Sequence, residues 1–304
     1  MKVLITGSSG FIGQHMLTNL QRNDVQCVPF SRKNGCTYAE ISIDWINNEK
    51  IDVIVHLAGL THDTNNVNNE ELYYEVNTEL TKGLFDKFTA SNASGFIYLS
   101  SIKALADMSD NLLTENLTPN PKSVYGKSKL AAENYLLKQS QKSNKRVVIL
   151  RPAMVYGPGN KGNLNSLYQI VAKGIPWPLG EYENLRSFCS VENLCFIVNE
   201  IIQNPSIASG IYHIADDEPV STNDLIREIA KVLKKKPRIW KAPKCLVNFI
   251  ARLGDSVKLP INTERLHKLT SSFRVSNGKI SAAIGKPMPV SVRDGLFKTL
   301  SSFK

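Results

Sequence analysis

The chain has 304 residues, of which 42% are hydrophobic and 21% are charged, and its formal net charge is +10. This composition is typical of a globular protein and excludes a disordered or collagen-like chain. No apolar run approaches the roughly 20 residues that a membrane-spanning helix needs, so we expect no stable membrane insertion. The apolar start at residues 1–5 is too short for a signal peptide, and we expect a cytoplasmic protein.

The distributions of cysteine and charge further limit the class of protein and its expected partners. The five cysteines are odd in number and show no CxxC spacing, which argues against a disulfide framework and against a metal site. Residues 227–304 contain 18 Lys or Arg and 4 Asp or Glu, whereas the rest of the chain has a net charge of −4. A basic C-terminal part indicates an anionic ligand or surface, or simply a solvated face. The basic run 231–244 has Trp240 as its one aromatic residue, so we expect no nucleic-acid partner.

Short apolar runs alternate with segments of helical spacing along the first 150 residues. The run at 2–6 ends at glycines, as a buried strand does, and we expect further strands at 25–30, 36–43, 51–57, 95–100, 146–150 and 210–214. We expect helices at 11–22, 70–91, 125–142 and 193–203, and another that starts at Ser221 and ends near 235. This alternation predicts an α/β fold, a Rossmann-type doubly wound parallel sheet.

The pattern changes after Arg151-Pro152, because residues 156–190 are rich in Gly, Pro and Asn. We therefore expect a dinucleotide-binding domain over 1–158 that is rejoined by about 187–215. The remainder, mainly 159–304, is expected to form a smaller mixed α/β lobe that binds the substrate.

Three glycines stand between the first strand and the first helix: Gly7, Gly10 and Gly13. Glycines there permit a tight turn and a close approach of the backbone to a diphosphate. The helix N-terminus adds free N–H groups and the positive end of its dipole. This strand–turn–helix context predicts a dinucleotide site rather than a plain connecting turn.

The end of the second strand should select between cofactors. An acid there accepts hydrogen bonds from the ribose of NAD, whereas an arginine accommodates the 2′-phosphate of NADP. Ser31 and Arg32 follow this strand, and Asp24 lies in the turn before it. The residues therefore favour NADP(H). NAD(H) is the alternative, with Arg32 stacked on its adenine.

A tyrosine and a lysine four residues apart, Tyr125 and Lys129, share one face of a predicted helix. A free tyrosine has a pKa of about 10, and a nearby ammonium is expected to lower the pKa of Tyr125 so that it can act as a general acid or base. Ser101 follows the fifth strand, where parallel sheets bind ligands, and its hydroxyl can hold a carbonyl or alkoxide. Taken alone, the pair also fits a surface lysine packed on an aromatic ring.

The motifs in this order resemble the extended short-chain dehydrogenase/reductase family, and more narrowly its nucleotide-sugar epimerases, dehydratases and reductases. They are residues 6–13, His56-Leu57-Ala58-Gly59, Leu99-Ser100-Ser101 and Tyr125-xxx-Lys129. Residues 151–159, 161–164 and 186–194 extend the resemblance over nearly the whole chain.

The resemblance implies a role for each matching residue. Ser101, Tyr125 and Lys129 would be catalytic, and Asn77 would support the central strands. Substrate would be bound by Ser101, Tyr125, Asn163 and Arg186, the last two at the diphosphate of a UDP-sugar. The cofactor-binding residues, with Ser31 and Arg32 included, would be Gly7, Gly10, Phe11, Ile12, Gly13, Ser31, Arg32, Leu57, Ala58, Gly59, Tyr125 and Lys129.

Two departures from the epimerase pattern affect the expected reaction. The acid after the second strand is missing, and Ser101 is followed by Ile102-Lys103-Ala104 rather than by an epimerase-like Val-Tyr-Gly turn. Both favour reduction of a UDP-4-keto-6-deoxy-(N-acetyl)hexosamine in surface-polysaccharide synthesis. The alternative is a UDP-glucose or UDP-GlcNAc 4-epimerase with tightly bound NAD. A non-catalytic redox-sensing regulator would have no need of the Tyr–Lys pair. The resemblance also implies a homodimer, formed by the helices near 70–91 and 125–142.

Overall fold

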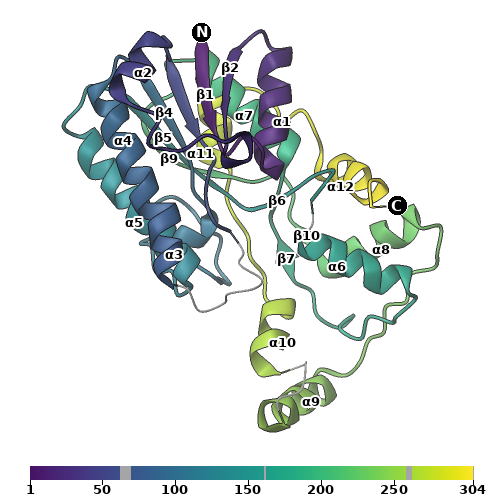
Figure 1. Cartoon of the computed structure of the whole chain (residues 1–304). Coiled ribbons are helices and arrows are strands. Elements are labelled where there is room, and N and C mark those ends of the chain that lie inside the picture. Colours follow the sequence, from purple (N-terminus) through teal and green to yellow (C-terminus); the bar gives the residue numbers. More distant parts are fainter. Residues whose placement is uncertain (62–69, 161, 258–261, 304) are drawn as a thin grey trace.

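The computed structural model describes residues 1–304 except 62–69, 161, 258–261 and 304. Its central sheet has six parallel strands in the order β2-β1-β3-β4-β5-β9 (Figure 1). These are β1 Lys2–Thr6, β2 Gln26–Phe30, β3 Val53–His56, β4 Gly95–Leu99, β5 Arg146–Pro152 and β9 Gly210–Ile214. The order reverses between β1 and β3, the place where open parallel sheets bind ligands. The predicted doubly wound parallel sheet is confirmed.

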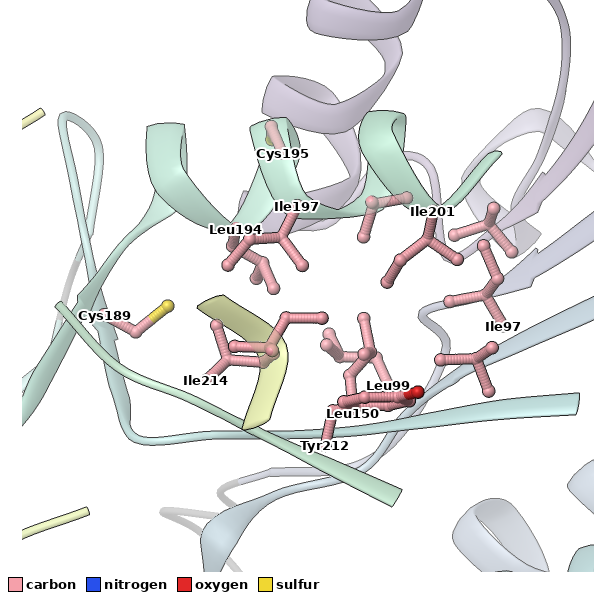
Figure 2. Close-up of a cluster of buried hydrophobic side chains, with 14 of the residues drawn as sticks. Ile97, Leu99, Leu150, Cys189, Leu194, Cys195, Ile197, Ile201, Tyr212 and Ile214 are labelled. Carbon is pink, nitrogen blue, oxygen red and sulfur yellow. The ribbon is translucent and has the colours of Figure 1, made fainter. Parts of the chain in front are cut away.

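Helices cover both faces of this sheet. On one face, α1 (Phe11–Arg22), α7 (Val191–Gln203) and α11 (Gly278–Ile284) contribute to a single hydrophobic cluster with the strands. Figure 2 shows Leu194, Ile197 and Ile201 of α7 turned toward Leu150 and Ile214 of the strands. Because the side chains of β1, β3, β4 and β5 are buried on both faces of the sheet, these strands read as near-continuous apolar runs.

The opposite face is covered by α2 (Ile43–Asn48), α4 (Leu80–Ala90) and α5 (Val124–Ser140), whose apolar residues form the second cluster with the strands. The expected long helix before α5 is divided into α3 (Glu70–Tyr74), a π-helical turn η2 (Glu75–Glu79) and α4. Such π turns inside helices are frequent at functional sites.

The predicted strand at 36–43 is wrong, because the described residues there form turns that lead into α2. The apolar spacing of Cys36, Tyr38 and Ile41 instead reflects side chains that pack on the second cluster from a loop. Ser42 then caps α2, and its hydroxyl accepts a hydrogen bond from the Trp45 N–H at 3.0 Å. A cap of this kind begins a helix and ends any extended segment before it.

A second set of elements lies beside the sheet, at the lower right of Figure 1. Helices α6 (Asn163–Ala172), α8 (Thr222–Val232) and α12 (Val292–Ser301) share a hydrophobic cluster. Two short two-stranded sheets connect them, and α9 and α10 lie farther from the central sheet (Figure 1). The remaining bounds are η1 Arg32–Asn34, η3 Ile102–Ala104, β6 Met154–Tyr156, β7 Leu185–Arg186, β8 Phe188–Ser190, β10 Val220–Ser221, α9 Lys244–Val257 and α10 Thr263–Thr270. Among the helices described, none has the length and apolar character to cross a membrane.

Candidate active site

The turn between β1 and α1 is closely packed against the chain that follows β3. Gly7 has a φ of +71°, and a Cβ at this position would lie 2.7 Å from the Ala58 backbone nitrogen. A Cβ on Gly13 would lie 2.2 Å from the Gly7 carbonyl oxygen. Glycine is therefore required at both positions, and the turn brings Gly7 and Ala58 together at the reversal in strand order.

Gly10 lies on the outer side of this turn, where a diphosphate can approach the N-terminus of α1. It is exposed, and a Cβ there would meet the Gly7 carbonyl oxygen at 3.3 Å, so little protein stands over it. Gly10 is also the N-cap of α1, which receives no side-chain cap and has no acid in its first turn. Phe11 and Ile12 begin the helix and are partly buried. The unsatisfied N–H groups and the helix dipole fit the diphosphate of a dinucleotide cofactor.

The end of β2 presents a hydroxyl and a cation where an acid would bind the ribose of NAD. Ser31 is 5% exposed, and its hydroxyl oxygen has no hydrogen-bond partner within the described part of the chain. Arg32 begins η1 and is exposed. An orphaned buried hydroxyl and an exposed guanidinium can both bind polar groups of a dinucleotide cofactor.

Ser101 and Tyr125 meet where β4 ends and α5 begins. The Ser101 hydroxyl lies near enough to the Tyr125 phenol to favour its ionised form, and it accepts from the Lys103 backbone N–H at 3.2 Å. Ser123 caps α5 with its hydroxyl and so fixes the helical turn that carries Tyr125. The ring of Tyr73 packs edge-on against Tyr125, with ring centres 6.3 Å apart. The Tyr125 phenol and the Ser101 hydroxyl therefore lie close together, an arrangement suited to binding one carbonyl oxygen.

Lys129 lies one turn further along α5 and is buried. Its Nζ donates to the Leu99 carbonyl oxygen at 3.0 Å and lies 4.8 Å from the centre of the Tyr98 ring. A Cβ on Gly59 would lie 3.0 Å from the same Nζ, so the ammonium also touches the chain after β3. Burial lowers the pKa of Lys129 to about 8, and the charge of Glu133 opposes this shift.

The expected lowering of the Tyr125 pKa is wrong for this arrangement. Burial raises the pKa of Tyr125 to about 12, and the hydrogen bond from Ser101 offsets only part of this effect. The reason lies in the direction of the Lys129 ammonium, which is bonded to Leu99 and stacked on Tyr98. Tyr125 is therefore protonated at neutral pH.

Asn77 connects the loop after β3 to α5, and its carbonyl oxygen accepts from the Tyr98 hydroxyl of β4 at 3.5 Å. From the π turn, its side-chain oxygen accepts from the Leu60 N–H at 2.8 Å. Its amide nitrogen donates to the Leu60 carbonyl and the Ser128 hydroxyl, each at 3.0 Å. Leu57, Ala58 and Gly59 lie in the segment that these bonds hold against α5.

A group of basic side chains, Lys103, Arg186 and Lys268, lies beside Ser101. Arg186 on β7 is partly buried, its Nε has no hydrogen-bond partner within the described residues, and its Nη2 donates to the Lys268 carbonyl. Burial lowers the pKa of Lys103, the charge of Asp107 opposes this shift, and the charges of Arg186 and Lys268 add to it. Lys103 donates to the Asp107 carbonyl at 2.6 Å, and Lys268 is paired with Glu264 at 2.5 Å. Asn163 is the first residue of α6. The unused Nε donor of Arg186, beside two further cations, makes this a candidate site for a polyanion.

This combination of glycine turn, Ser–Tyr–Lys set and strand order agrees with a match found along the sequence. Residues 3–215 match the model of the NAD dependent epimerase/dehydratase family. The chain belongs to this family. It is thus an NAD(P)-dependent enzyme of the short-chain dehydrogenase/reductase type, as the motifs implied.

Relatives within this family include both epimerases and reductases. A UDP-glucose 4-epimerase of Vibrio cholerae is 30% identical over 326 residues, which cover 99% of this chain and 95% of that protein. A GDP-6-deoxy-D-mannose reductase of Pseudomonas aeruginosa is 24% identical, with 88% and 90% covered. The structure of RMD from Pseudomonas aeruginosa complexed with NADPH superimposes with a TM-score of 0.75 at 21% identity, covering 99% of this chain and 98% of that one. This structural likeness shows the shared fold.

A buried ionic cluster that the sequence motifs did not indicate supports α5, the helix of Tyr125 and Lys129. Glu133, one turn after Lys129 on α5, is fully buried and accepts from the Ser100 hydroxyl at 2.5 Å. Arg151 of β5 donates to both oxygens of the same carboxylate, its Nε at 3.0 and 3.1 Å and its Nη2 at 2.5 Å. The cluster joins α5 to the ends of β4 and β5. Glu133 was detectable as a charged residue on the buried face of a predicted helix.

Proposed function

We propose that this chain is an NADP(H)-dependent oxidoreductase acting at C4 of a UDP-hexose. Its reaction would be the reduction of a UDP-4-keto-6-deoxy-(N-acetyl)hexosamine. The end of β2 carries this proposal, because Ser31 offers an unpartnered buried hydroxyl and Arg32 an exposed guanidinium where NAD-binding sites place an acid. A reductase that consumes NADPH needs such a preference, whereas an epimerase that retains its cofactor does not.

The protonation state of Tyr125 suits the reductive direction. When bound, the nicotinamide would supply a hydride to C4 of the sugar. The Tyr125 phenol, which is protonated at neutral pH both at the ordinary tyrosine pKa of about 10 and at its raised pKa of about 12, would donate its proton to the C4 oxygen. Ser101 would hydrogen-bond this oxygen as negative charge develops on it. Lys129, buried between β4 and the loop after β3, would bind the cofactor ribose and keep a positive charge beside the site.

The cluster of Lys103, Arg186 and Lys268 is proposed to bind the diphosphate of the UDP-sugar, together with Asn163 at the start of α6. An arginine suits this role because its planar guanidinium can donate several hydrogen bonds to phosphate oxygens at once. The buried Nε of Arg186 is one such unused donor. Residues 159–304 would then form most of the substrate lobe, and residues 1–158 with the 187–215 segment the cofactor domain.

A 4-epimerase with tightly bound NAD is the second candidate. The observation that favours it is the 30% identity, over nearly the whole chain, to the Vibrio cholerae UDP-glucose 4-epimerase. Both reactions use the same Ser101, Tyr125 and Lys129, so the catalytic residues do not distinguish them.

The cofactor requirement separates the two candidates in one assay. An epimerase regenerates its cofactor in every cycle, whereas a reductase consumes one NADPH for each product. We expect the purified protein to form no UDP-GalNAc from UDP-GlcNAc without added cofactor, and to oxidise NADPH in proportion to a UDP-4-keto-6-deoxy-hexosamine supplied to it. UDP-GalNAc produced without added cofactor would contradict the reductase proposal.

Arg32→Ala tests the cofactor preference directly. We expect the Kd for NADPH to rise at least about 10-fold, which corresponds to about 1.4 kcal/mol of lost binding free energy. The Kd for NADH should stay within about 2-fold, because NADH lacks the 2′-phosphate. Titration of protein fluorescence with each cofactor gives both values. Equal weakening of the two cofactors would instead mean that Arg32 stacks on the adenine.

We also propose a place and an assembly for the enzyme. None of the five cysteines, all of which lie in the described residues, forms a disulfide, which supports a reducing, cytoplasmic location. A C4 reduction there would supply 6-deoxy sugars for surface polysaccharides such as O-antigen or capsule. A homodimer through the helices at 70–91 (α3, η2 and α4) and α5 follows from the family resemblance; α4 and α5 pack side by side on one face of the sheet (Figure 1).

A further inference from the structure

Helix α9 leaves a continuous apolar face uncovered. It packs on the substrate lobe through Val247 and Ala251, which are buried with Leu179 and Leu266 in a small cluster of their own. A neighbouring stripe, spaced i, i+3, i+4 and i+7 and therefore on one side of the helix, is between 43% and 60% exposed. Its members are Leu246, Phe249, Ile250 and Leu253.

Exposed apolar side chains are concentrated in this part of the chain. Fifteen large apolar residues are more than a third exposed within the described residues, and six of them lie between 240 and 269. Besides the α9 stripe, they are Trp240, which is 61% exposed, and Leu269 on α10. Single exposed apolar residues need no explanation, whereas a contiguous stripe marks a surface that binds something.

The charges around the stripe favour an anionic surface as its binding partner. Residues 240–270 contain six Lys or Arg and two acids. The described cations of α9, Lys244 and Arg252, are exposed. Both acids are engaged, Glu264 with Lys268 at 2.5 Å and Asp255 with the Thr263 N–H at 3.0 Å. A second copy would bring an equally basic lobe against this face and be repelled, whereas an anionic surface would be attracted.

We propose that α9 is an interfacial helix that holds the enzyme reversibly on an anionic lipid bilayer. Amphipathic helices with leucine, phenylalanine and tryptophan on one side and basic residues beside them lie in the headgroup region without crossing the membrane. Figure 1 places α9 at the end of the molecule away from the central sheet, where a flat surface can reach it.

This surface lies close to the candidate active site. Helix α10 packs beside α9, and the Nδ1 of its His267 lies 3.4 Å from the sulfur of Met108. Met108 belongs to the segment that follows Ser101 and Lys103. Bound through α9, the enzyme would therefore carry its substrate lobe against the bilayer. The inference rests on exposure and charge, so it stands or falls independently of the proposed reaction.

Vesicle flotation of the full-length protein tests the proposal. We expect at least about 10-fold more protein on vesicles of equal phosphatidylglycerol and phosphatidylcholine than on phosphatidylcholine alone, with release at high salt. Phe249→Glu combined with Leu253→Glu should reduce binding at least about 10-fold. Phe297→Glu is the matched control, since Phe297 on α12 is 51% exposed and should be dispensable.

Three outcomes would overturn the proposal: no preference for anionic vesicles, equal binding by the double variant, or equal loss of binding in the control. A fourth would be self-association of the wild type in lipid-free buffer that the double variant abolishes, because the face would then join two copies. Unchanged circular dichroism and NADPH affinity show that the variants fold. If the double variant does not fold, Lys244→Glu with Arg252→Glu, both exposed, should weaken anionic binding by a similar factor.

Discussion

Tyr125→Phe is expected to lower kcat about 1000-fold while the Kd for NADPH changes by less than about 2-fold. The substitution removes the one proton donor placed beside Ser101, and general acid catalysis contributes about 100- to 10,000-fold. The ring itself remains, so its edge-on packing against Tyr73 is retained. NADPH oxidation in the presence of the 4-keto sugar gives kcat, and fluorescence titration gives the Kd.

The same helix offers the control. Tyr135 lies on the outer side of α5 and donates to Asp86 at 2.6 Å. Tyr135→Phe therefore makes the same chemical change away from the site and should leave kcat within about 2-fold. More than a tenth of the wild-type kcat in Tyr125→Phe would show that another group, such as Lys103, delivers the proton.

The fold was largely predictable because its signals are local. Buried parallel strands are apolar on both faces, and β1, β2, β4 and β5 end at a glycine, serine or proline that local sequence reveals. The same locality explains the error at 36–43. The spacing of apolar residues alone cannot distinguish an alternating strand from a loop whose side chains reach the core. Ser42, a residue type that caps helices, was the local signal that a helix rather than a strand begins here.

The candidate site was predictable in its residue types and less so in its electrostatics. Tyr125 and Lys129 are adjacent on a helix, so their neighbourhood followed from spacing. The direction of the Lys129 ammonium depends on Leu99 and Tyr98, which come from a different strand, and no local pattern specifies it. The pKa of Tyr125 therefore shifts the opposite way from the expectation based on the pair alone.

The proximity of the basic residues Lys103, Arg186 and Lys268 also could not be predicted from local sequence. Lys103 stood out in the sequence only as a departure from the epimerase pattern. Phe273 brings these residues together, because it pairs with Arg186 of β7 and its ring centre lies 5.2 Å from the Lys103 Nζ, while Arg186 donates to the Lys268 carbonyl. These contacts join residues more than 80 positions apart, which periodicity in a short window does not report.

Arg151→Leu should lower the free energy of unfolding by about 3–5 kcal/mol, the largest stability effect that we expect from a single substitution. Arg151 and Glu133 are 2% and 0% exposed, and in the described structure the arginine forms the ion pair of that carboxylate. Its removal leaves a buried carboxylate with the Ser100 hydroxyl as its hydrogen-bond partner and the charge of Lys129 one turn away, but without its ion-pair partner. The cost is therefore that of breaking a buried ion pair by removing one partner. Urea unfolding followed by circular dichroism measures it.

Two further variants distinguish this explanation from simple loss of packing. Arg227→Leu removes an arginine whose 2.6 Å ion pair with Asp224 is exposed, so it should cost less than about 1 kcal/mol. Arg151→Leu combined with Glu133→Leu removes both charges and should recover most of the stability lost in the single variant, because an apolar pair can replace a buried ion pair at little cost. If the double variant is as unstable as Arg151→Leu alone, the lost free energy belongs to the shape of the arginine, and the isolated carboxylate is not its cause.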